Sequence, residues 1–229
     1  MMMRRRHRRA RQRGVGTMEV LVASVLTIVI ALAIMGFFDA QERAYASLST
    51  YASSQNVTRT VVDLMSREIR MSSYDPTQPA SAGAFVPYPG PSCPGVEQGL
   101  HTAAAQRIRI QQDLSGDGLI ASANEDVTYA QVGDEIQRTD NVTNTTITLV
   151  ENVPSGGFRI RYFDNQSNPV EIVPSGSPAQ LTQAQRACVQ KVVIEVESVI
   201  PDPYPNHPDL HSVVRSGVTI RNRWIASNF

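Results

Sequence analysis

The sequence predicts an α+β protein in which a long N-terminal helix packs against an antiparallel β-sheet domain. All fourteen prolines lie at position 76 or later, and no glycine occurs between Gly36 and Gly83, so little interrupts a helix over residues 17–74. Residues 75–99 are rich in proline and glycine and are predicted to form a long loop. Beyond the loop, short segments of alternating polar and apolar residues are typical of strands.

Charge divides the chain near its start. Seven of the 21 basic residues are arginines within residues 1–14, so the remaining 14 face 21 acidic residues, a formal net charge of −7. Residues 20–38 carry no charge and would span roughly 28 Å as a helix, close to the thickness of a bilayer core. Arginines retained in the cytoplasm would place everything from Asp39 onward outside it. We therefore interpret the basic arm as a topology signal rather than a nucleic-acid-binding segment.

Three interpretations of this apolar segment compete. A cleaved secretory signal needs small residues at positions −1 and −3, and a cut after Ala40 would put Phe38 at −3. An uncut signal anchor is the second interpretation. Neither accounts for Glu19, a carboxylate at the edge of the apolar run, where a charge is costly unless it is paired or lies among the lipid headgroups.

The third interpretation starts from Gly14, which ends the basic stretch, and from Glu19, the fifth residue after it. This arrangement resembles the type III signal of type IV prepilins and pseudopilins. The resemblance implies that a prepilin peptidase cuts between Gly14 and Val15 and that Val15 becomes an N-methylated terminus. It also implies that Glu19 meets the terminal amine of a neighbouring subunit and sets the axial register of assembly. The start Val15-Gly16-Thr17 departs from the family, which usually begins with Phe, then Thr and Leu.

The family resemblance implies a pilin fold, in which one helix serves first as membrane anchor and filament core and then covers a globular domain. Spacings of three and four predict an apolar seam on the second part of the helix. Its members are Ala44, Leu48, Tyr51, Val62, Met65 and Ile69, with interruptions at Gln55 and Thr58. The predicted divisions are a cleaved leader (1–14), a transmembrane and assembly helix (15–38), its amphipathic continuation (39–74), a loop (75–99) and an antiparallel β domain (100–229).

The β domain is predicted to be an antiparallel meander with one face against the helix, because its strand-like segments follow one another closely. The segments are residues 107–111, 126–131, 135–139, 145–150, 157–163, 189–197 and 213–221, and residues 181–187 could form a short helix. The stretches from Leu149 to Asp164 and from Asp113 to Tyr129 look like recurrent parts of PilW-type minor pilins and J-type pseudopilins.

Two further sets of residues have local explanations as well as functional ones. Cys93 and Cys188 would close a disulfide in an oxidising compartment, or remain two small unpaired side chains. The spacing of a calcium-binding loop is nearly matched by four residues, Asp113, Ser115, Asp117 and Glu125. The closing acid of such a loop stands at the twelfth position, whereas Glu125 comes one residue later. A polar turn between strands is the alternative.

The sequence contains no nucleophile elbow, phosphate-binding loop or zinc-protease motif, so we expect a structural protein rather than an enzyme, with no cofactor apart from the calcium candidate. The resemblance implies a minor pilin that joins a type IV pilus, in its priming or tip complex. Its expected partners are prepilin peptidase, other pilins and the inner-membrane assembly platform. It would lie in the inner membrane with a periplasmic body and reach the cell surface after assembly. The alternatives are a type II secretion pseudopilin and an uncut, signal-anchored binding protein or enzyme.

Overall fold

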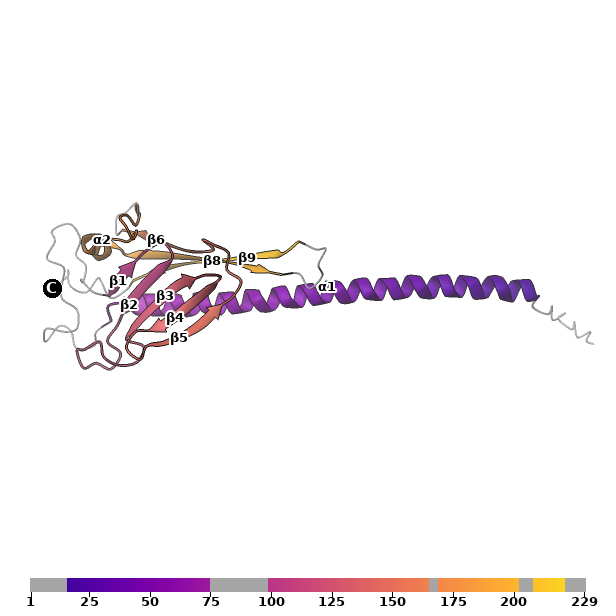
Figure 1. Cartoon of the computed structure of the whole chain (residues 1–229), viewed down its shortest axis with the longest axis horizontal. Coiled ribbons are helices and arrows are strands. Elements are labelled where there is room, and N and C mark those ends of the chain that lie inside the picture. The colour runs from indigo at the N-terminus through magenta and orange to yellow at the C-terminus, as the bar shows by residue number, and fades with distance from the viewer. Residues whose placement is uncertain (1–15, 75–98, 165–168, 202–207, 221–229) are drawn as a thin grey trace, which may run out of the picture. The chain divides into compact units, whose positions relative to one another are not determined.

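The computed structural model describes residues 16–74, 99–164, 169–201 and 208–220, and it combines a long helix with antiparallel sheets, so the α+β class is confirmed (Figure 1). The chain divides into two compact units, Met1–Leu48 and Ser49–Phe229. In the first unit the described residues after Gly16 are helical and belong to helix α1, which runs from Thr17 to Met71. The second unit contains the remainder of α1 and all of the strands.

Helix α1 ends three residues before the predicted boundary at Tyr74. Ser73 adopts a positive φ of 67°, which an α-helix cannot continue through, and its backbone N–H donates to Gln111 O at 2.9 Å instead. The turn is closed by Tyr74 N–H, which donates to Met71 O at 2.8 Å. A local backbone conformation rather than a proline therefore stops the helix.

The predicted apolar seam exists only in the last part of α1. Val62, Met65 and Ile69 are buried, as predicted, and Thr58, which looked like an interruption, is buried as well. The prediction was wrong at Ala44 and Leu48, because both side chains are exposed. Thr58 is the first residue of this helix that is fully buried, and its Oγ1 lies 3.5 Å from Ser198 Oγ of the second sheet.

The first sheet is a five-stranded antiparallel meander in the order β1-β2-β3-β4-β5. The predicted bounds of β2 and β5 agree with the structure, those of β3 and β4 fall one residue short, and β1 was not predicted. The strands are β1 (Leu100–Ala103), β2 (Arg107–Gln111), β3 (Asp126–Val132), β4 (Glu135–Asp140) and β5 (Thr145–Val150).

The second sheet has the order β7-β6-β8-β9, so the prediction of a single meander was wrong. After β5 the chain leaves the first sheet, and strand β6 pairs with β8. The two-residue strand β7 pairs with β6 and forms the border of the second sheet. A short helix, α2 (Gln183–Cys188), precedes β8 and carries a capping box built by Thr182 and Gln185. The strands are β6 (Phe158–Phe163), β7 (Glu171–Ile172), β8 (Lys191–Ile200) and β9 (Leu210–Thr219).

A tight link between β5 and β6 explains why the chain changes sheets. Asn152 adopts a positive φ of 57°, and its carbonyl accepts from Val199 N at 2.8 Å, which ties the link to β8. A Cβ on Gly157 would lie 2.9 Å from Glu197 O and 2.8 Å from Pro154 Cδ, so only glycine allows the backbones to approach this closely. The link therefore redirects the strand into the second sheet.

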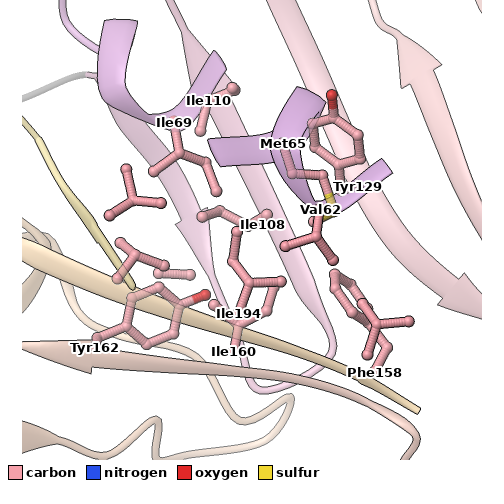
Figure 2. Close-up of a cluster of buried hydrophobic side chains, with 14 of the residues drawn as sticks. Val62, Met65, Ile69, Ile108, Ile110, Tyr129, Phe158, Ile160, Tyr162 and Ile194 are labelled. Carbon is pink, nitrogen blue, oxygen red and sulfur yellow. The ribbon is translucent and has the colours of Figure 1, made fainter. Parts of the chain in front are cut away.

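The core lies between α1 and the two sheets (Figure 2). Figure 2 shows Met65 and Ile69 of the helix facing side chains such as Ile108 of the first sheet and Ile160 of the second. Tyr162 is fully buried, and its hydroxyl donates to Ala104 O at 2.8 Å, so one polar group of β6 is satisfied by the segment that joins β1 to β2. Both sheets and the helix thus share one core in the second unit.

Candidate functional site

The N-terminal part of α1 is the first candidate site, because its side chains are apolar and exposed. Residues 20–38 contain only apolar or small residues, and the most hydrophobic window of the helix has none of its residues buried. Its hydroxyl groups are satisfied within the helix, since Ser24 donates to Leu21 O at 2.8 Å and Thr27 to Ala23 O at 2.7 Å. The helix is long and apolar enough to span a membrane.

Glu19 lies in the first turn of this helix. The backbone N–H groups of Glu19 and Val20 donate to Gly16 O at 2.9 and 3.2 Å, so Gly16 starts the hydrogen-bonded turn. Unsatisfied N–H groups give the N-terminal end of a helix partial positive charge, which favours a carboxylate there. No charged residue follows Glu19 until Asp39. The carboxylate therefore marks one end of an uncharged helical segment.

The proposed cleavage site lies outside the described residues, as do both Gly14 and Val15. Cys93 also lies outside them. Cys188, at the end of α2, does not carry a free thiol, and its pairing with Cys93 stays a prediction.

The calcium candidates form a loop between β2 and β3 that is held by hydrogen bonds to its own backbone. Asp113 is buried, and its carboxylate accepts from Gly116 N at 2.7 Å and Gly118 N at 2.9 Å. Glu125 is also buried and accepts from the backbone N–H groups of four residues, Leu114, Ser115, Ala121 and Ser122. These two acids organise the loop from opposite ends of its sequence.

The remaining calcium candidates occupy the same loop. Ser115 Oγ donates to Asp113 Oδ1 at 3.3 Å, and Asp117 Oδ1 accepts from Leu119 N at 2.8 Å. Burial alone would raise the pKa of Glu125, but its backbone hydrogen bonds hold that pKa below its ordinary value, so the carboxylate stays charged. Among the described residues, no three His, Cys, Asp or Glu side chains form a group that could hold a metal ion. The geometry favours the polar-turn interpretation.

A polar connection between helix and sheet was missed by sequence reasoning. Glu68 accepts from the Tyr129 hydroxyl at 2.6 Å and from Arg138 Nη2 at 2.9 Å, and all three side chains are largely buried. Arg138 also donates to Asn124 Oδ1 at 2.9 Å. The only sign of this connection in the sequence is that Glu68 stands next to Ile69 of the predicted apolar seam. Its partners Tyr129 and Arg138 are 61 and 70 residues away along the chain, so the contacts could not be predicted.

Comparison with known proteins gives a short result. No family model, no curated protein and no solved structure matches this chain. Any functional conclusion therefore depends on the chemistry of the three regions described above.

These three regions differ in what they can do. The β2–β3 loop uses its carboxylates internally, and the Glu68 cluster joins α1 to the first sheet. Only the N-terminal part of α1, among the described residues, combines a charged group with an extended exposed apolar surface. It is therefore the stronger candidate for a functional surface.

Proposed function

We propose that this chain is a type IV pilin-like structural subunit, a minor pilin that is anchored in the inner membrane and assembled through its N-terminal helix. The observation that carries the proposal is the carboxylate of Glu19 in the first turn of a helix whose next nineteen residues are uncharged. The pilin fold and the pilus itself are part of this proposal.

The electrostatic argument concerns the partner of Glu19. The helix end compensates only part of a full negative charge, and a carboxylate in a low-dielectric surrounding needs a cation. Residues 15–38 contain no Lys or Arg, and the first basic residue after Glu19 is Arg43. Cleavage after Gly14 would create an α-amine four residues before Glu19. That amine, from the same subunit or from a neighbour, is the cation that the sequence supplies.

The exposed apolar side chains give the same helix a second role. Residues such as Leu26, Val29 and Met35 have more than half of their surface exposed, so they need lipid or other helices around them. Before assembly a bilayer would cover them, and in a filament the equivalent helices of neighbouring subunits would do so.

The decisive experiment compares Glu19→Gln with Glu42→Gln in cells that assemble the filament. Both changes remove one exposed carboxylate from the same helix, but only Glu19 borders the uncharged segment. We expect Glu19→Gln to remain in the membrane fraction and to fail in assembly, and Glu42→Gln to assemble normally. The mass of the mature N-terminal peptide should correspond to a start at Val15.

Normal filaments containing Glu19→Gln subunits would contradict the proposal. So would a mature protein that begins at Met1, which would leave Glu19 without a new amine nearby, or one that begins after Ala40, which would lack Glu19 altogether.

A further inference from the structure

The two sheets present four border strands, and three of them are protected against pairing with another strand. Strand β7 has only two residues, and β1 has Leu181 beside it, whose N–H donates to Ala103 O at 2.8 Å. Strand β9 carries Arg215 and His211, which reach Glu195 and Glu197 of β8. Short length, coverage and charge are the usual means of protecting a sheet border.

The fourth border, β5, has none of these three protections, and its only irregularity is a register shift in the pairing with β4 between Thr148 and Val150. It pairs with β4 on one side, and no strand lies on its other side in the described sheet. Its six residues, TTITLV, contain no charge, proline or glycine, and they are β-branched in five positions out of six. Residues 145–148 are exposed, including Ile147, with 47% of its surface accessible. Such a strand can accept another strand along its free side.

A groove lies beside the end of β5 and is open to solvent. It has a volume of about 260 Å³ and is formed by α1 on one side and by β5 with the residues that follow it on the other. Its lining is mixed, with Val57 of the helix and Leu149 of the strand as apolar side chains among polar ones such as Ser54. Ile147 points to the same side of the sheet as Arg138, its cross-strand neighbour. The volume suits a large apolar side chain of an added strand.

Acidic side chains cluster at the same end of the hairpin. Ile136 pairs with Val150, so Glu135 and Glu151 are the next residues along the two strands at this end, and Asp134 precedes Glu135 in the turn between β3 and β4. None of these three acids forms an ion pair with a described residue. Hydrogen bonds from Gln137 and Thr148 lower the pKa of Glu135, so this carboxylate is ionised at neutral pH. A basic residue on an incoming strand would meet uncompensated negative charge here.

We propose that β5 is a docking border for an extended segment of another protein, which adds a strand beside β5, places an apolar side chain in the groove between Val57 and Leu149, and sets a basic residue against Glu135 and Glu151. This inference goes beyond the proposed function and does not depend on the fate of Glu19. Backbone hydrogen bonds would supply affinity, and the groove and the acidic end would supply selectivity.

The test uses the full chain in detergent micelles and a labelled synthetic peptide, Lys-Val-Thr-Val-Thr-Val-Thr-Lys, followed by fluorescence anisotropy. We expect saturable binding that is lost when alternate peptide nitrogens are methylated, because a methylated nitrogen cannot donate to β5. Ile147→Lys should weaken binding at least about tenfold by placing a charge on the border. The matched control is Val213→Lys on β9, where the original side chain is 58% exposed.

Further variants keep the result interpretable. Thr146→Lys, on the opposite face of β5, should also weaken binding, and Glu151→Gln should weaken the lysine-ended peptide more than a threonine-ended one. Unchanged melting curves would show that each variant is folded. Equal binding by Ile147→Lys and the original chain, or by the methylated peptide, would overturn the proposal. A concentration-dependent dimer that Ile147→Lys abolishes would overturn it too, because the border would then belong to a second copy.

Discussion

The two parts of helix α1 use similar residues with opposite outcomes. Residues 20–38 are apolar around the whole helix and exposed, whereas residues 58–71 place apolar side chains on one face and bury them. Met35 is 66% exposed and Met65 is fully buried, although both are methionines of one helix. A helix that is apolar on all sides requires an apolar environment, but one with a single apolar stripe requires only a domain to cover it. The pattern, rather than the residue type, decides which part the domain stabilises.

The largest expected difference follows from this pair of methionines. Met65→Ala should lower the free energy of unfolding by about 2–5 kcal/mol, because it leaves a cavity among core side chains. Met35→Ala, the matched control, should change it by less than about 0.5 kcal/mol. Chemical denaturation monitored by circular dichroism would measure both. Equal destabilisation by the two variants would remove the distinction between the parts of the helix.

The reverse contrast is expected for membrane insertion. An arginine at Val29, near the middle of the apolar segment, should oppose insertion by about 2.5–3.5 kcal/mol. Ser53→Arg, at an exposed position of the second unit, should leave insertion unchanged. Alkaline extraction of membranes followed by immunoblotting would separate inserted from released chains. Full retention of Val29→Arg would argue against a membrane role for this segment.

A smaller effect is expected where the packed part of the helix is joined to the sheet. Burial, reinforced by the neighbouring Glu68 carboxylate, raises the pKa of Tyr129 far above its ordinary value, so its hydroxyl stays protonated and donates. Tyr129→Phe should therefore cost about 1 kcal/mol of unfolding free energy through the lost hydrogen bond. A double-mutant cycle with Glu68→Gln would measure the coupling. Additive effects would mean that the contact contributes nothing.

Acid should affect the second unit through Asp126. Its burial favours the neutral form, but hydrogen bonds from Arg109, Gln111 and Asn141 hold the pKa of Asp126 below its ordinary value. The resulting stability is present above the unfolded pKa of about 3.9 and is lost as the pH falls through the lower folded value. Melting temperatures measured between neutral pH and about pH 2 should fall steeply below about pH 4.

The matched variants test whether Asp126 is a cause of that loss. Asp126→Asn should make the fall of the melting temperature below about pH 4 less steep but should not abolish it. Hydrogen bonds also lower the pKa values of Glu125 and Asp140 despite their burial, so these groups contribute to the same fall. Asp63→Asn, on the exposed face of α1, is the control and should leave the curve unchanged. If the melting temperature of Asp126→Asn fell with pH as steeply as that of the original chain, the pH dependence would belong to other groups.

Local patterns predicted the helix and most of the strands because helix breakers and alternation act over a few residues. Residues 107–111 and 145–150 became strands with the predicted bounds. The division into two sheets was not predictable, since it depends on the close approach of Gly157 to Glu197, 40 residues later. The contact of Glu68 with Arg138 joins residues that are even further apart, 70 positions along the chain. Glu19 was found as a local exception, an acid bordering an apolar run, and its proposed role stays a prediction.

The loop from Asp113 to Glu125 has a consequence for the environments in which the domain can keep its shape. Its two buried carboxylates act as built-in anions, because they gather backbone N–H groups from both halves of the loop. Loop geometry is then set by covalently attached anions whose local concentration never changes. Dilution cannot remove these anions, so the hydrogen bonds that shape the connection between β2 and β3 are not lost through dissociation.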